Sequence, residues 1–342
     1  MQSTDSRTQI VQLVFGAMAA EVLFTAARLG IADRMGDEER TGSDVAGDIG
    51  ADPTSVTRLL RTMAALGILT ETAPGRFSLT EAGSLLRSDR PDSMHSFVEM
   101  FGDPAMLAAW RELGHAVHTG ETTFDRVFGT SFFGYLADRP ELSARFNAAM
   151  RQGTAATAQQ LPDAYDFSEY RTVADIGGGD GTLLTAVLAA NPHLHGILFD
   201  TAEGLAQADA TFTAAGVAER CQTVVGDFFR TAPEGADLYT IKSVLHDWDD
   251  DRCRTILAHM RNVIPAHGRL LIIEPVLPPT VDGTLPPQMY LSDLNMLVNV
   301  GGRERTRADF EELCADAGFR LATVTPLPPP AAFSLLEAEP VS

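Results

Sequence analysis

A glycine-rich stretch after a short β-rich run most constrains the fold of this chain. Residues 175–181 have the sequence Asp-Ile-Gly-Gly-Gly-Asp-Gly, between a β-rich run at 172–177 and a helical pattern at 182–190. Six further β-rich runs follow, separated mostly by helical patterns, at 196–200, 222–225, 238–244, 270–274, 321–325 and 333–336. This alternation predicts an α/β fold with a doubly wound, mostly parallel, seven-stranded sheet, and the last two runs are expected to form a closing hairpin.

Glycines after the first strand let the chain turn sharply and approach a ligand closely. In a doubly wound sheet, ligands bind beyond the carboxyl ends of the strands. A dinucleotide fingerprint that begins at Gly177 and Gly179 would need glycine at position 182, where the chain has Thr182. A nicotinamide-dependent oxidoreductase is therefore disfavoured.

Acidic residues at three successive strand ends favour a different cofactor. Asp175 suits a cationic ligand such as the sulfonium and amino group of S-adenosylmethionine. Asp200, at the end of the second strand, can accept both ribose hydroxyls. After the third strand, Asp227 and Phe228 offer an acceptor and an aromatic face for adenine.

The fourth strand leads into His246-Asp247-Trp248 on the same side of the sheet. Asp249, Asp250 and Asp251 follow, and we interpret them as a helix cap and acidic first turn rather than as a metal site. The fifth strand ends at Glu274, and residues 301–306 form a Gly-Gly-Arg-Glu-Arg-Thr stretch.

The first ninety residues have the order of a winged helix. An apolar helix at 10–29 precedes short helices near 43–48 and from Pro53, and a hairpin is expected at 69–72 and 76–80. Nine arginines and twelve acidic residues give this segment a net charge of −3, so a dimerisation role is favoured over DNA binding. The expected domains are 1–90 for dimerisation, 91–160 as a helical, substrate-lining connection, and 161–342 for catalysis.

Composition also limits the classes of partner and the compartment that we expect for this chain. The net charge of −20 disfavours nucleic acid and anionic lipid. Three widely spaced cysteines suggest neither a disulfide framework nor a metal site, and a reducing cytoplasm is expected. No uninterrupted apolar run has the length of a membrane helix, so no membrane contact is expected.

Together these motifs resemble the plant-type small-molecule O-methyltransferases and their bacterial relatives from antibiotic pathways. The resemblance spans the winged-helix module, the 175–181 loop, Gly226-Asp227-Phe228, Lys242 through Trp248, Glu274 and residues 301–306. It implies a class I, Rossmann-like methyltransferase domain, a homodimer, S-adenosylmethionine as methyl donor with S-adenosylhomocysteine as product, no metal, and a phenolic, polycyclic acceptor.

The resemblance also implies roles for single residues. His246 would be the general base, flanked by Glu274 and Glu304. The cofactor contacts would come from Asp175, Gly177, Gly179, Asp200, Asp227, Phe228, Lys242 and Trp248. The acceptor would contact Met100, Phe146, Asn147, Met150, Asp247, Met296 and Asn299.

Three other functions stay open at this stage. Some relatives keep the fold and bind S-adenosylmethionine but catalyse hydroxylation or decarboxylation, because fold does not settle reaction type. A winged-helix regulator and a nicotinamide oxidoreductase are weaker alternatives. The presence of His246, Glu274 and Glu304 favours methyl transfer.

Overall fold

The computed structural model describes residues 5–329 and 331–341. The chain divides into two compact units. The first comprises the residues up to Leu107 together with Ala144–Gly153, and the second comprises Ala108–Ser143 and the residues from Thr154 onward. The long helix α11 (Pro140–Ala164) contributes residues to both units.

The first unit has the winged-helix order that the sequence predicts. Its elements are α1 (Ser6–Arg28), α2 (Ile31–Met35), β1 (Arg40–Thr41), α3 (Gly42–Ile49), α4 (Pro53–Ala65), β2 (Leu69–Ala73), β3 (Arg76–Leu79), α5 (Glu81–Ser84) and α6 (His95–Phe101). Local signals explain the helix starts: Thr41 forms a capping box with Asp44, and the Asp52 side chain accepts from the amide of Ser55. The antiparallel sheet has the order β1-β3-β2, with the wing formed by β2 and β3.

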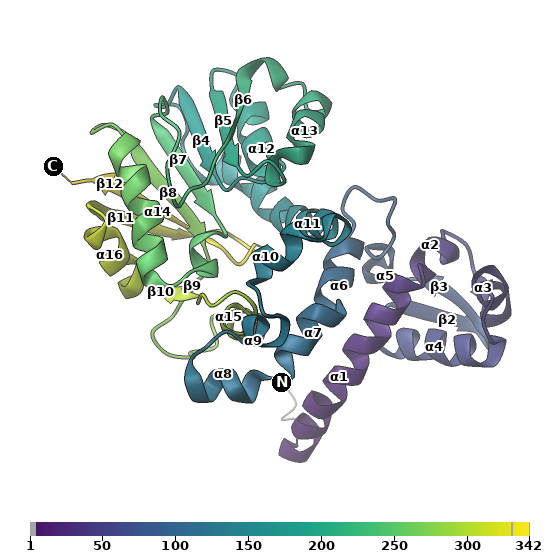
Figure 1. Ribbon diagram of the computed structural model, residues 1–342. Coiled ribbons are helices and arrows are strands. Elements are labelled where there is room, and N and C mark those ends of the chain that lie inside the picture. The colour runs from purple at the N-terminus through teal and green to yellow at the C-terminus, as the bar shows by residue number, and fades with distance from the viewer. Residues whose placement is uncertain (1–4, 330, 342) are drawn as a thin grey trace. The chain divides into compact units, whose positions relative to one another are not determined.

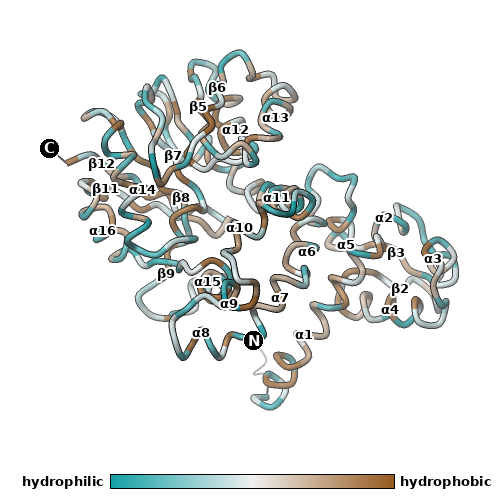
Figure 2. Tube along the Cα trace, in the orientation of Figure 1, coloured by the Kyte–Doolittle hydropathy of each residue, from teal (hydrophilic) through white to brown (hydrophobic). Residues whose placement is uncertain are grey.

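Helix α1 leaves much of its apolar surface exposed, and hydrophobic residues recur along its length (Figure 2). By length and composition alone it is long and apolar enough to cross a membrane, a test that core helices and signal sequences also pass. The helix passes this test because its alanines keep it apolar on average, although Gln12 and Glu21 interrupt its apolar runs as the sequence indicates.

The second unit contains the predicted seven-stranded sheet, in the order β11-β12-β8-β7-β4-β5-β6 (Figure 1). The strands are β4 (Thr172–Ile176), β5 (His195–Asp200), β6 (Cys221–Val225), β7 (Leu238–Lys242), β8 (Arg269–Glu274), β11 (Phe319–Pro326) and β12 (Ser334–Pro340). The pairs among β4 to β8 are parallel, and β12 is antiparallel to both β8 and β11. The closing hairpin is thus confirmed, with β12 inserted next to β8.

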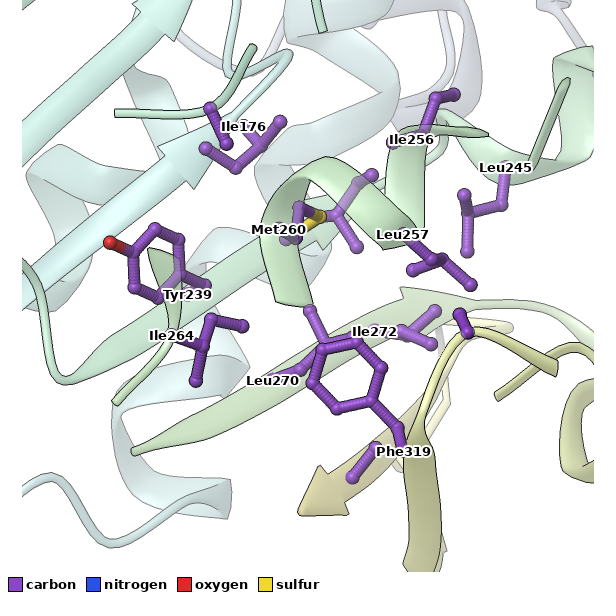
Figure 3. Close-up of a cluster of buried hydrophobic side chains, with 14 of the residues drawn as sticks. Ile176, Tyr239, Leu245, Ile256, Leu257, Met260, Ile264, Leu270, Ile272 and Phe319 are labelled. Atoms are coloured by element: carbon purple, nitrogen blue, oxygen red, sulfur yellow. The ribbon is translucent and has the colours of Figure 1, made fainter. Parts of the chain in front are cut away.

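Helices cover both faces of this sheet. On one face, α14 (Asp250–Val263) and α16 (Arg307–Asp316) pack against the strands, and Figure 3 shows Leu257 and Met260 among Tyr239, Ile272 and Phe319. On the other face lie α12 (Thr182–Ala190), α13 (Ala208–Ala214) and the end of α11. Burial on both faces explains why the central strands have continuous apolar sequences rather than alternating ones.

Several shorter elements complete the two units. They are α7 (Pro104–Trp110), α8 (Leu113–Thr119), α9 (Thr123–Phe128), α10 (Phe132–Ala137), α15 (Pro287–Asn299), β9 (Val276–Leu277), β10 (Arg305–Thr306) and the 3₁₀ turns η1 (Gly204–Gln207), η2 (Ala218–Arg220) and η3 (Leu245–Asp247). β10 pairs in parallel with β9, which directly follows β8. This pairing carries Glu304 to the end of β8, where Glu274 lies.

Candidate active site

The turn after β7 carries the predicted base. Ser243 has a φ of 52°, the only positive value at a non-glycine residue in the described ranges. That left-handed conformation is strained for serine and turns the chain abruptly into η3, which contains His246. His246 therefore lies at the carboxyl end of the parallel strands, where ligands bind in such folds.

Carboxylates face both ring nitrogens of His246. Its Nδ1 donates to Glu304 Oε1 at 3.2 Å and lies 3.6 Å from Glu274 Oε2. Its Nε2 lies 3.6 Å from Asp247 Oδ1. Only 15% of the His246 side chain is exposed, while Glu274 and Glu304 are buried.

This arrangement strongly favours the protonated imidazole. Burial alone lowers the pKa of His246, but the charges of Glu274 and Asp247, with the hydrogen bond and charge of Glu304, raise it to about 10. Burial also raises the pKa of Asp247 to about 7 and raises that of Glu274, with the His246 charge opposing both shifts. The cluster is therefore a set of coupled acids and bases that can hold or release a proton.

The two glutamates are held in different ways. Glu274 Oε1 accepts the backbone amides of Val244 and Leu245, each at 3.0 Å, so this carboxylate also fixes the turn that carries the histidine. Glu304 Oε1 accepts from Ser292 Oγ at 2.8 Å in addition to the ring. Two acceptors anchored by separate elements orient the ring and fix which nitrogen faces outward.

The same three side chains satisfy a geometric test for a metal site. Ligand atoms of His246, Glu274 and Glu304 all lie within 4.8 Å of one another. Yet Oε1 of each glutamate already accepts two hydrogen bonds, from backbone, serine or histidine donors. Hydrogen bonding thus accounts for the position of one oxygen of each glutamate, whereas the buried Oε2 of each has no partner within the described ranges. The metal-free site stays a prediction.

The 175–181 loop provides space at the end of β4. Gly177 and Gly179 both have positive φ, and a Cβ at Gly179 would meet nothing within 4 Å. Gly178 is tightly enclosed, since its Cβ would lie 2.4 Å from Leu198 and 2.6 Å from Asp175 Oδ2. The loop therefore needs glycine for two different reasons, conformation and close packing.

The acids around this loop are poised to accept hydrogen bonds. Asp175 Oδ1 accepts from Thr240 at 2.7 Å, whereas its buried Oδ2 has no partner among residues 5–329 and 331–341. Burial raises the pKa of Asp175 to about 7. Asp200 accepts from the Gly179 amide at 2.8 Å and retains lone pairs for further donors.

The remaining predicted cofactor residues gather nearby in the second unit. Phe228 lies against Gly177, and Trp248 contacts Phe228 and Phe229, with ring centroids 6.4 and 4.8 Å away. Asp227 is exposed, and its Oδ1 accepts from the amide of Phe229. Trp248 Nε1 is a buried donor with no partner in the part of the chain that is described.

Lys242 is the single lysine of the chain. Its Nζ donates to Ser243 Oγ at 2.9 Å and Thr154 Oγ1 at 3.2 Å, over the ring of Phe333. Burial lowers the pKa of Lys242 to about 8, although the charges of Glu274, Asp175 and Asp247 oppose this shift.

The predicted acceptor residues are divided between the units. Asp247, Met296 and Asn299 belong to the second unit, where Asn299 donates to Asn295 Oδ1 at 2.8 Å. Its own Oδ1 is buried and lacks a partner within the described ranges. Met100, Phe146, Asn147 and Met150 belong to the first unit, on α6 and α11, and Met100 is buried there.

Other residues around the site were not singled out from the sequence. Asn295 accepts from Trp110 Nε1 at 2.9 Å, and Asp293 Oδ1 accepts the Glu304 amide at 2.8 Å. With Ser292, these residues lie on α15, which is otherwise largely apolar. Polar residues recurring along one apolar helix are a signal that could have pointed to them.

Two family models match most of the chain. Residues 11–89 match the O-methyltransferase dimerisation domain, and residues 110–320 match the O-methyltransferase domain. The chain belongs to the O-methyltransferase family. It is an S-adenosylmethionine-dependent O-methyltransferase, with the class I fold and dimerisation module that the sequence resemblance implied.

The relatives of this methyltransferase include antibiotic-pathway enzymes. It is 50% identical over 338 residues to O-demethylpuromycin-O-methyltransferase of Streptomyces alboniger, covering 98% of this chain and 90% of that one. The crystal structure of LaPhzM has a TM-score of 0.92 at 43% identity, covering 99% and 100%. NcsB1 from neocarzinostatin biosynthesis, solved with S-adenosylmethionine and 2-hydroxy-5-methyl naphthoic acid, has a TM-score of 0.79 at 32% identity, covering 94% and 96%.

The residues of this methyltransferase suit its cofactor. The open space at Gly179 and the unpartnered Asp175 Oδ2 and Trp248 Nε1 are features that a bound nucleoside and amino acid can satisfy. The nearby acids also suit a sulfonium cation.

Proposed function

We propose that this enzyme methylates a phenolic hydroxyl of an aromatic, polycyclic natural product, with His246 as the general base. The observation that carries the proposal is the His246 ring, buried between Glu274, Glu304 and Asp247 at the carboxyl end of the sheet. The names of the relatives support the substrate class, since they include a phenazine O-methyltransferase and an enzyme solved with a naphthoic acid.

The raised pKa of His246 matches the base to such an acceptor. A free imidazole, with a pKa of about 6.5, would take a proton from a phenol of pKa about 10 at a cost of roughly 5 kcal/mol. The surrounding carboxylates raise the pKa of His246 to about 10, so the transfer becomes nearly balanced. The same raised pKa means that His246 is mostly protonated at neutral pH in the free enzyme, so the fraction able to accept a proton is small.

In this mechanism Nε2 takes the hydroxyl proton while Nδ1–H stays bonded to Glu304. Asp247, beside Nε2, stabilises the resulting imidazolium. The bound cofactor supplies an electrophilic methyl group on its sulfonium. The acceptor oxygen forms the new bond to this methyl as the sulfur bond breaks, and much of the acceleration comes from holding both reactants together.

The test is methyl transfer from labelled S-adenosylmethionine to a panel of polycyclic phenols, with the wild type and His246→Ala compared. We expect transfer in the wild type and a loss of at least about a hundredfold in kcat for the variant. His95→Ala is a suitable control, because that histidine belongs to the first unit and bonds Leu86 O. Full transfer by His246→Ala, or cofactor binding without transfer to any phenol, would contradict the proposal.

The assembly and location belong to the same proposal. We infer a homodimer formed through the dimerisation module, because the exposed apolar face of α1 is costly on a monomer. A reducing cytoplasm suits the three cysteines, which form no disulfide.

A further inference from the structure

The mechanism above leaves unused one deeply buried charge near His246, the guanidinium of Arg305. Arg305 is 1% exposed, and its guanidinium donates to Leu245 O at 2.7 Å and to Trp248 O at 2.8 Å. These two carbonyls stand on either side of the His246-Asp247 dipeptide. We propose that Arg305 is a positioning residue for the base, because it holds both ends of the turn that carries His246.

Arg305 also donates hydrogen bonds to Asp250, which does not belong to the group of His246, Asp247, Glu274 and Glu304. Its Nε and Nη2 donate to Asp250 Oδ1 at 3.1 and 2.7 Å, in the first turn of α14. Although burial raises the pKa of Asp250, hydrogen bonds from Arg305 and Arg303 hold it below its usual range. The guanidinium charge is therefore balanced by Asp250, and Arg305 acts on His246 through geometry. A planar fork of five donors is suited to such a clamp.

Gly302 closes the same turn from a second side. A Cβ at this position would lie 2.0 Å from His246 O and 2.4 Å from the carbonyl carbon of Asp247. These neighbours are backbone atoms, which cannot move aside as the end of a flexible side chain can. Only glycine therefore fits at position 302. The backbone of Gly302 thus lies directly against the backbone of the turn that carries His246.

The stretch 302–305 therefore contacts the turn in three ways. Gly302 packs on its backbone, Glu304 bonds the His246 ring, and Arg305 bonds the carbonyls before and after the ring-bearing residue. One short segment thus sets both the ring's hydrogen bond and the position of the main chain from which the ring extends. Displacing a catalytic group by about 1 Å can cost about a hundredfold in rate.

The inference rests on the proposed role of His246, and its test must separate positioning from folding. Arg305→Ala removes the clamp, and Arg303→Ala is the matched control. Arg303 bonds the other oxygen of Asp250 at 2.9 Å and also reaches Asp309, so its loss removes an ion pair from the same aspartate. All rates are normalised to folded enzyme, counted by S-adenosylhomocysteine binding.

For Arg305→Ala we expect kcat to fall by at least about tenfold, with the KM for S-adenosylmethionine changed by less than about threefold. Added guanidinium ion should restore part of the rate, whereas methylammonium, which lacks the fork, should not. Nitrogen NMR of the free enzyme should show the His246 pKa moving towards its ordinary value, because the ring leaves Glu304 while Glu274, Asp247 and Lys242 remain nearby. Arg303→Ala should show none of these changes.

If Arg305→Ala does not fold, Arg305→Lys and Gly302→Ala address the same point. Each should lower kcat and shift the His246 resonances. A single lysine ammonium lacks the spaced donors that hold both carbonyls and Asp250 at once, and an added Cβ at Gly302 displaces the turn. Wild-type kcat and unchanged resonances in the folded variants would overturn the inference, as would a loss of rate equal to that of Arg303→Ala. Full activity of His246→Ala would instead overturn the proposed base, while the NMR of Arg305→Ala would still report on the clamp.

Discussion

His246 Nδ1 lies 3.2 Å from Glu304 Oε1, although 58 residues separate them in the chain. The parallel pairing of β10 with β9 brings Glu304 to the end of β8, and Glu274 lies there already. His246 and the two glutamates beside it therefore come from three separate segments: the turn after β7, the end of β8 and the residue before β10. The pKa of His246 depends on the distances between its ring and these carboxylates.

The rate should rise with pH in the neutral range. Because His246 accepts a proton only when neutral, raising the pH towards its pKa of about 10 increases the active fraction. The bound sulfonium, as a nearby like charge, should lower this pKa, so the kinetic midpoint should fall below that of the free enzyme. Steady-state rates measured between about pH 6 and 10, compared with NMR titration of His246, check this prediction. A rate that is flat with pH would contradict it.

Glu274 and Glu304 should differ in their effect on stability. Glu274→Ala leaves the buried amides of Val244 and Leu245 without their acceptor, so we expect a loss of about 2 kcal/mol or more in the free energy of unfolding. Glu304→Gln keeps the side-chain shape and should cost less than about 1 kcal/mol while lowering kcat at least about tenfold. Urea unfolding and kcat measurements on both variants test this contrast. Equal destabilisation would count against the distinct roles.

Gly178→Ala should weaken cofactor binding. The added Cβ would lie 2.4 Å from Leu198 and 2.6 Å from Asp175 Oδ2, so the loop must shift. We expect the Kd for S-adenosylmethionine to rise by at least about tenfold, measured by calorimetry. Gly47→Ala is the control, because its Cβ on α3 would meet nothing within 4 Å. An unchanged Kd for Gly178→Ala would show that the loop does not hold the cofactor.

A charge on the apolar face of α1 should disrupt the dimer. Leu13 is exposed within this face, so Leu13→Asp places a carboxylate where the partner chain is expected. Light scattering should give twice the chain mass for the wild type and a concentration-dependent shift towards one chain mass for the variant. Gln12→Glu adds the same charge at a neighbouring polar position and should keep the dimer. A monomeric wild type would refute this assembly.

Chelation should leave the activity intact. The hydrogen bonds to Glu274 and Glu304 account for the approach of their carboxylates to His246 without an ion. We expect EDTA-treated, dialysed enzyme to retain its kcat, with metal content measured by mass spectrometry. Loss of activity that zinc or magnesium restores would show that the trio binds a catalytic metal.

Local sequence signals were sufficient for most of the fold. All seven main strands form close to the predicted positions, and turns or helices separate them. The central strands are apolar enough to be buried on both faces, whereas the outer strands β6 and β11 are largely exposed. The capping residues Thr41 and Asp52 likewise start α3 and α4 through contacts within four residues. Such short-range interactions can be predicted from the sequence because the residues that form them are close in the chain.

The remaining details depended on contacts between distant segments. They include the position of β12 next to β8, the hydrogen bond from Ser292 to Glu304 and the hydrogen bonds from Arg305 to the turn that carries His246. The sequence by itself determined the strands, the glycine-rich loop and the histidine at a strand end. Only the tertiary structure decided which carboxylates face each nitrogen of His246, because hydrogen bonds and pKa values depend on distances that chain spacing does not specify.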